Sequence, residues 1–259
     1  GQGVAQGGIV DTPDGKWYAM LFQDSGAVGR IPILLPVTWK DHFPFFGQNG
    51  HVPEEIEVHS TRPGYIYQPL VGSDDFCNGL LPRWQFNHDP DPRYYHLDAL
   101  QATYTITTRE VCTELTQAGN TLTQRMSYPS CAAEVTVDAS ALKEGDVAGL
   151  CALQGCYAAV GITKHHGKYE VLMLDKKEDG ILYMTEGTVV ESHQMDFRLE
   201  ADFCNMKDEA RCYYRVNKGD WLPIGTVHKL YFKLDHFTGC RFGLFCYAAE
   251  ETGGSACFR

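Results

Sequence analysis

Residues 147–174, VAGLCALQGCYAAVGITKHHGKYEVLML, hold three apolar segments separated by turn signals. The segments cover 147–154, 158–163 and 169–174, and the last two are joined through His166-Gly167-Lys168. Each is too short for a typical helix and rich in the residues that strands favour. This stretch predicts three successive antiparallel strands.

The same pattern continues over 74–259 without a convincing helix. Further strand-like segments lie at 102–108, 122–126, 133–138, 189–191, 196–201, 210–216, 229–234 and 241–247. Turn sequences such as Lys143-Glu144-Gly145-Asp146 separate them. Many short strands spaced by turns favour an all-β antiparallel sandwich over a fold of alternating strands and helices.

The composition of the chain argues against some classes of function. The chain has 259 residues, 44% of them hydrophobic, enough for a large core, and a formal charge of -11. With no extended basic cluster, nucleic acid is not an expected partner. No run of 18 apolar residues predicts a membrane span. Ten cysteines lack zinc-site spacing, so we expect free thiols in a cytoplasmic protein, with some disulfides in a secreted one as the alternative.

The first 46 residues differ from this region. Strand-like segments at 8–11, 16–22 and 30–39 surround a Thr12-Pro13-Asp14-Gly15 turn and a Gly-rich loop, which predicts a small antiparallel sheet. Residues 47–73 then hold many Gly and Pro residues together with charges. We interpret 47–73 as a linker along the surface, and as a domain boundary.

Several motifs are more specific than the alternation of strands and turns. QGGIVDTP (6–13), KWY (16–18), FQD (22–24) and GAVGR (26–30) resemble the last propeller blade of glycoside hydrolase family 43, the β-xylosidases and α-arabinofuranosidases. WQFNHDP (84–90), NTLTQR (120–125) and GDVAGL (145–150) resemble the C-terminal domain of the same enzymes. The order and spacing also match across nearly the whole chain.

The resemblance implies a domain organisation. Residues 1–46 would be the last blade of a five-bladed β-propeller, 47–73 a linker, and 74–259 a concanavalin-A-like sandwich of jelly-roll type. The earlier blades would lie outside this chain. A single blade cannot bury both faces alone, so we expect it to pack on the missing blades, on a second copy in a homo-oligomer, or on its own sandwich.

It also implies a reaction, the inverting hydrolysis of xylosyl or arabinofuranosyl linkages in xylan- or arabinoxylan-type oligosaccharides. Inversion needs a general acid and a general base, and family 43 carries its three active-site carboxylates on earlier blades. No catalytic residue is therefore expected here. Asp11, Asp24 and Asp41 are better explained as turn or surface residues than as acid/base groups.

Three residues are candidates for substrate binding. In the resembling enzymes the arginine of the Gly-Arg motif, Arg30 here, points into the subsite of the cleaved sugar. Phe237 would lean over the mouth of the active site, and Gln6 could face the propeller axis. The alternatives are a structural arginine, a core phenylalanine and a structural amide. Ala5 replaces a histidine found in many members, which excludes imidazole chemistry there.

No cofactor is expected. Related sandwiches sometimes hold a structural calcium near Asp74-Asp75 and the terminal strand. Here Cys257 replaces the usual acidic residue, which removes a hard oxygen ligand and argues against calcium.

Two other functions stay open. The chain could be a free-standing carbohydrate-binding sandwich, or a structural domain that stiffens the propeller. A binding module usually exposes two or three aromatic rings as a platform. Only Trp84 and Trp221 lie in the sandwich region, and Trp221 alone sits in a loop-like stretch.

Overall fold

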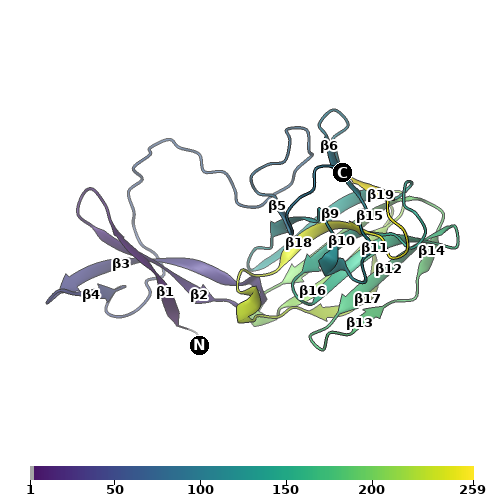
Figure 1. The fold of residues 1–259 in the computed structure, drawn as a ribbon. Coiled ribbons are helices and arrows are strands. Elements are labelled where there is room, and N and C mark those ends of the chain that lie inside the picture. The colour runs from purple at the N-terminus through teal and green to yellow at the C-terminus, as the bar shows by residue number, and fades with distance from the viewer. Residues whose placement is uncertain (1–2) are drawn as a thin grey trace.

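The computed structural model describes residues 3–259 and is built from antiparallel β-strands (Figure 1). Within that range the helical segments are four single 3₁₀ turns: η1 (Gly26–Val28), η2 (Leu115–Gln117), η3 (Cys204–Met206) and η4 (Leu234–His236). No helix of the described chain is long and apolar enough to cross a membrane. The all-β class predicted from the segment lengths is confirmed.

The N-terminal sheet is a four-stranded meander that extends away from the rest of the molecule (Figure 1). Its strands are β1 (Val4–Asp11), β2 (Trp17–Asp24), β3 (Arg30–Lys40) and β4 (Phe43–Phe46), in that order. Between β1 and β2, Gly15 takes a positive φ of 77° and Thr12 N–H donates to Lys16 O over 2.8 Å. The predicted hairpin is therefore present.

One face of this sheet carries its apolar side chains in register. Trp17 lies opposite Val37, Ala19 opposite Leu35, and Leu21 opposite Ile33. Ala19 and Leu35 are buried in a small cluster. Ile9, Met20, Phe43 and Phe45 are 42%, 49%, 70% and 52% exposed, so the sheet keeps much apolar surface in water.

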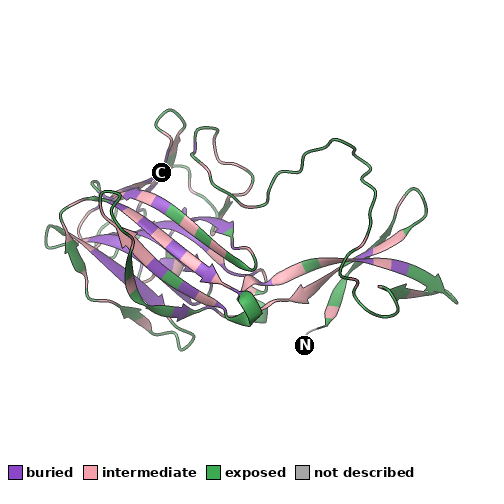
Figure 2. Ribbon diagram, turned by 180° about the vertical axis from the view of Figure 1, so that it is seen from behind, coloured by how far each residue is buried: buried purple, intermediate pink, exposed green. Residues whose placement is uncertain are grey.

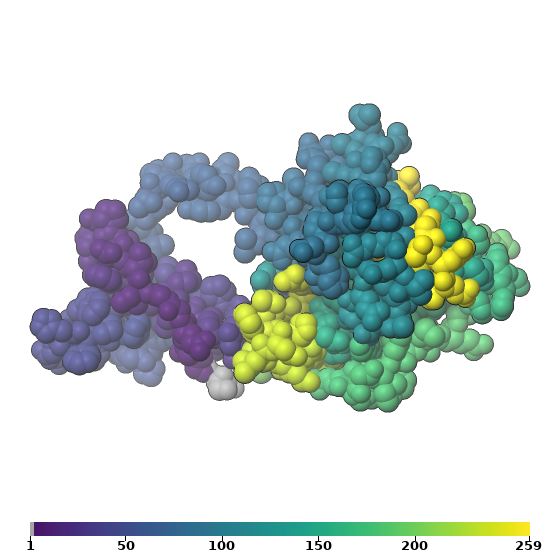
Figure 3. Space-filling view, in the orientation of Figure 1, coloured from purple at the N-terminus to yellow at the C-terminus, as the bar shows by residue number. Residues whose placement is uncertain are grey.

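Residues 47–84 connect the two parts without a regular strand or helix. The irregular backbone thus runs beyond residue 73, up to Trp84. Figures 2 and 3 show the segment arching over the space between the N-terminal sheet and the sandwich, mostly exposed. An elongated, exposed path agrees with its Gly and Pro content.

The remaining strands form two stacked sheets. The eight-stranded sheet has the order β13 (Leu182–Met184), β12 (Lys168–Lys176), β11 (Tyr157–His165), β10 (Val147–Leu153), β18 (Arg241–Tyr247), β8 (Leu122–Arg125) and β5 (Gln85–Phe86), with β14 (Thr188–Val190) also paired to β12. The seven-stranded sheet has the order β17 (Leu222–Lys229), β16 (Glu209–Arg215), β15 (Gln194–Asp202), β9 (Ser130–Asp138), β19 (Ser255–Phe258), β7 (Thr103–Thr107) and β6 (Tyr95–Asp98).

The stretch 147–174 forms the middle of the eight-stranded sheet. Val147 lies opposite Thr163 and Leu153 opposite Tyr157, which fixes β10 against β11. Alternate residues of these strands face two different cores. Leu150 and Val160 lie between the sheets, whereas Cys151 and Tyr157 lie on the other face, beneath η2. Burial on both faces explains why the stretch is apolar almost throughout.

One predicted strand is wrong. The strand expected at 229–234 is instead β17, Leu222–Lys229, and regular structure stops at Lys229. β17 contains Pro223 and Gly225, and it lies at the edge of its sheet, where a missing N–H and a positive φ of 70° at Gly225 are tolerated.

Candidate functional site

The N-terminal sheet meets the sandwich where residues 25–30 touch residues 236–240, a contact that we call the seam. Arg30 N–H donates to Phe237 O over 3.2 Å, and Cys240 N–H donates to Ala27 O over 2.9 Å. Ala27 is fully buried and belongs to the core of the sandwich. The seam therefore fixes the start of β3 against the loop that follows η4.

Two glycines make this close approach feasible. Gly29 and Gly239 have φ values of 93° and 86°, which favour glycine. A Cβ on Gly239 would lie 2.1 Å from Val28 O, and one on Gly29 would lie 2.6 Å from Gly239 N. Any side chain at either position would push the two backbones apart.

Arg30 is held by three side chains at the seam. Its Nε donates to Asp24 Oδ1 over 3.1 Å, directly across β2 and β3. Its Cζ lies 4.1 Å from the ring centroid of Phe22 and 4.7 Å from that of Phe237. Within residues 3–259 no acceptor lies within hydrogen-bond reach of its two Nη groups. The guanidinium is thus oriented while most of its donors remain available.

Phe237 is 43% exposed, so the structure excludes its reading as an ordinary core residue. Its ring covers Arg30 from the sandwich side, while Phe22 covers it from the N-terminal sheet. The structure therefore brings two of the three predicted substrate-binding residues into contact. Exposed aromatic surface next to oriented N–H donors is suited to binding a sugar ring and its hydroxyls.

Gln6, the third candidate, lies apart from them. It sits at a bulge in β1, between Ala5 opposite Phe22 and Gly7 opposite Leu21, with a positive φ of 54°. It is exposed, on the edge strand, two strands away from Arg30. The contact of Arg30 with Phe237 does not include it.

Asp208 packs against the η1 turn of the seam, a role that no sequence motif indicated. It is buried, and burial raises the pKa of its carboxyl, an effect that the nearby Ala27 N–H opposes. A Cβ on Gly26 would lie 2.6 Å from Asp208 Oδ2. The carboxylate therefore packs directly against the η1 turn that leads to Arg30.

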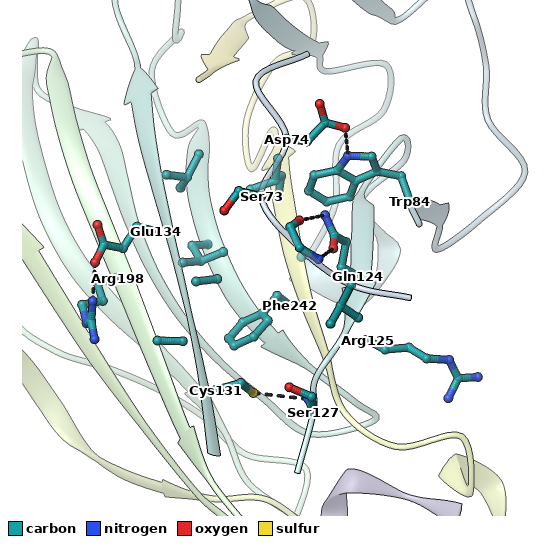
Figure 4. Close-up of a pocket in the computed structure, with 18 of the residues that line it drawn as sticks. Ser73, Asp74, Trp84, Gln124, Arg125, Ser127, Cys131, Glu134, Arg198 and Phe242 are labelled. Atoms are coloured by element: carbon teal, nitrogen blue, oxygen red, sulfur yellow. Dashed lines mark hydrogen bonds and ion pairs between the residues drawn. The ribbon is translucent and has the colours of Figure 1, made fainter. Parts of the chain in front are cut away.

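A separate cleft of about 450 Å³ opens between β8 and β9 (Figure 4). Phe242 forms its apolar floor, and Ser73 and Gln124 lie on its rim. Gln124 holds the end of the linker through two hydrogen bonds of 3.0 Å with the N–H and C=O of Gly72.

The region where related sandwiches sometimes hold calcium contains contacts between protein groups. Asp74 Oδ1 accepts from Phe76 N–H over 2.8 Å, and Asp74 Oδ2 accepts from Trp84 Nε1 over 2.8 Å. Ala256, Cys257 and Phe258 pair with β7 and β9 and not with residues 74–76. Across residues 3–259 no three His, Cys, Asp or Glu side chains come together as a metal site. All ten cysteines are free.

Comparison with known proteins now decides the family. Residues 73–259 match the family described as "Beta xylosidase C-terminal Concanavalin A-like domain", of glycoside hydrolase family 43. This chain belongs to that family. The concanavalin-A-like sandwich expected from the motifs is confirmed by this match and by the stacked sheets.

The similarity of this family 43 chain to known proteins also covers its N-terminal sheet. A "Beta-xylosidase" of Formosa agariphila is 24% identical over 97% of this chain and 46% of its own length. The solved structure of a "Bifunctional GH43-CE" protein of Bacteroides eggerthii is 41% identical with a TM-score of 0.89, over 99% of this chain and 34% of its own. A GH43 enzyme engineered for endo-xylanase and exo-arabinofuranosidase activity is 25% identical with a TM-score of 0.85, over 98% and 53%. The chain thus spans about half of these relatives or less.

Proposed function

We propose that this family 43 chain is the C-terminal part of a glycoside hydrolase that acts on xylan- or arabinoxylan-type oligosaccharides with inversion, and that its role is to position the substrate. The named activities of its relatives, a β-xylosidase and an enzyme with xylanase and arabinofuranosidase activity, support the substrate class. The observation that carries the positioning role is the oriented Arg30 guanidinium between Phe22 and Phe237.

The chemistry of Arg30 suits this role. A guanidinium stays charged beside the carboxylates of a hydrolase and offers fixed donors to sugar hydroxyls. Asp24 neutralises part of its charge and fixes its plane through Nε. The exposed ring of Phe237 would cover the bound sugar and exclude water from one side. Gln6 would face the propeller axis, away from the contact between Arg30 and Phe237.

The catalytic steps themselves require groups from the preceding blades. An inverting enzyme places its acid and base about 6.5–9.5 Å apart, on opposite sides of the scissile bond. Asp24 is paired with Arg30, and Asp11 and Asp41 are exposed, as turn and surface residues would be. We therefore expect this chain to need the missing blades as its partner for turnover.

A free-standing carbohydrate-binding module is less well supported. Trp84 stacks on Phe76 with ring centroids 5.7 Å apart and donates its Nε1–H to Asp74, so it is held in place by the sandwich. Trp221 is half-buried under the Arg215 guanidinium. Neither tryptophan offers a free flat ring for a platform.

A chimera tests the proposal. This chain would replace the matching third of the Bacteroides eggerthii protein, whose 41% identity makes it a suitable host. Hydrolysis of aryl β-xylosides, aryl α-arabinofuranosides and xylo-oligosaccharides would be compared for the parent, the chimera and the isolated chain.

We expect the chimera to hydrolyse the substrates that the parent hydrolyses, and the isolated chain to hydrolyse none. A folded chimera without activity on substrates of the parent would contradict the proposal. Turnover by the isolated chain that is lost in Asp11→Asn or Asp24→Asn would contradict it as well.

A further inference from the structure

Two arginines face each other across neighbouring strands of the sandwich. Arg125, the last residue of β8, lies directly opposite Arg241, the first residue of β18. Leu122 and Leu244 of the same strands point into the core between the sheets, so alternation puts both arginines on the other face. Like charges placed directly opposite destabilise a sheet unless something compensates them.

Within residues 3–259 no carboxylate supplies that compensation. Arg93, Arg109, Arg198, Arg211 and Arg215 of the sandwich form ion pairs with carboxylates. Over the same range neither Arg125 nor Arg241 has a carboxylate oxygen within 4.0 Å. The chain carries 33 acidic and 22 basic residues. The absence of a carboxylate beside Arg125 and Arg241 therefore does not follow from a shortage of acidic residues in the chain.

Partial burial increases the need for an anion. Arg241 is half-buried, with Leu153 opposite it on β10. Burial, and then the charge of Arg125, lower the pKa of Arg241. A charge that is partly removed from water without a partner costs free energy, which a bound anion would recover.

The arginines lie next to the seam. Arg125 Nη1 donates to Thr238 O over 2.8 Å, and Thr238 directly follows Phe237, whose ring lies over Arg30. Arg125 lines the end of the cleft between β8 and β9, and Figure 4 shows its guanidinium end directed away from that cleft. Any anion bound by the two arginines would therefore sit beside the proposed sugar site and outside that cleft.

We propose that Arg125 and Arg241 bind the carboxylate of a uronic acid residue carried by the oligosaccharide substrate. The inference rests on the proposed function, because it takes the sugar to lie at Arg30 and Phe237. Guanidinium groups match a carboxylate through charge-assisted, often bidentate, hydrogen bonds. Two of them side by side favour an acidic branch over a neutral sugar of the same size.

Binding to the full 259-residue chain tests this site. The probes are xylotriose with one glucuronic acid branch, unbranched xylotetraose, and free glucuronate, each titrated by calorimetry or NMR. The variants are Arg125→Gln/Arg241→Gln, Arg125→Lys, Arg30→Gln and, as a control on a distant ion-paired arginine, Arg211→Gln. Circular dichroism and thermal unfolding establish that each variant is folded.

We expect the acidic oligosaccharide to bind about tenfold more tightly than xylotetraose at low salt, and more tightly than glucuronate alone. The preference should disappear in about 0.5 M NaCl and in the double variant, weaken in Arg125→Lys, and persist in Arg211→Gln.

Equal affinity for the acidic and neutral oligosaccharides would overturn the inference, as would a preference that survives in the double variant. If xylotetraose still binds and its affinity falls in Arg30→Gln, the proposed function stands without the acidic site. If only the acidic preference is found and Arg30→Gln changes nothing, the arginine site stands and the role of Arg30 falls. Glucuronate binding as tightly as the oligosaccharide would mean that a free anion is the ligand, and would overturn the substrate assignment.

Discussion

Asp146 is a buried carboxyl that makes the stability of the fold depend on pH. Its Oδ2 accepts from Lys143 N–H over 2.8 Å, whereas Oδ1 is buried without a hydrogen-bond partner. Burial raises its pKa to about 6, above the value of about 3.9 expected in the unfolded chain. The folded state therefore binds this proton more tightly, and its contribution to stability is present below about pH 4 and is lost as pH rises to about 6.

Asp146→Asn should remove this dependence, because an amide keeps an acceptor for Lys143 N–H and carries no charge. We expect the variant to be about 1–3 kcal/mol more stable than the parent at pH 7.5 and equal to it near pH 4, measured by urea unfolding. Asp179→Asn is the control, since Asp179 also accepts a turn N–H, from Ile181, but is exposed. The same stability difference at both pH values would show that titration of Asp146 is not the cause.

At the seam, sequence reasoning identified some residues and missed others. The resemblance pointed to Arg30 and Phe237, and the structure places them in contact. It did not point to Phe22 stacking on Arg30, and Asp24 was assigned to a turn or the surface although it binds Arg30. Cross-strand pairing could have suggested Asp24 once register was known. Asp208 has no such signal, because a loop far along the chain brings it to η1.

At the level of strands, prediction succeeded where burial dominates. The segments at 147–154, 158–163 and 169–174 correspond to β10, β11 and β12, whose side chains are buried on both faces. Edge strands such as β6 and β17 were missed or misplaced, because exposed polar residues, Pro or Gly hide the strand pattern. The order of the strands in the sheets also could not be predicted from local sequence pattern. β18, for example, lies between β8 and β10 but is far from both in sequence.

The sandwich should fold without the N-terminal sheet. Its two cores consist almost entirely of side chains after residue 74, and Ala27 and Val28 at the seam are what the N-terminal segment adds to the main core. A chain starting at Ser73 should express as soluble protein and unfold in one cooperative transition. An insoluble product, or one without a cooperative transition, would mean that the seam is integral to the core.

Across the whole molecule, the N-terminal sheet remains largely uncovered. In residues 3–259 its backbone hydrogen bonds to the sandwich lie at the seam, and the sheet projects from the sandwich in Figures 1 and 3. Of the three packing partners expected for residues 1–46, the chain's own sandwich therefore covers only a small part of the described sheet. Leaving several large apolar side chains in water costs several kcal/mol at about 25 cal/mol per Å².

Such a surface favours association. We expect the 259-residue chain to dimerise or oligomerise through this sheet in sedimentation velocity experiments, and the chain starting at Ser73 to be monomeric. If both are monomers at high concentration, the packing argument fails. If both associate to the same degree, the contact lies on the sandwich instead.

Steady-state kinetics of Arg30→Gln in the Bacteroides eggerthii chimera show whether the seam presents Arg30 to the substrate. A donor that acts on the bound sugar should lower kcat/KM about 100-fold or more when it is removed, with no change in the melting temperature beyond a few degrees. Arg93→Gln, which removes an exposed ion-paired arginine of the sandwich, is the control and should stay within about twofold of the chimera. A folded Arg30→Gln chimera with kcat/KM as high as that of the control would show that Arg30 does not act on the bound sugar.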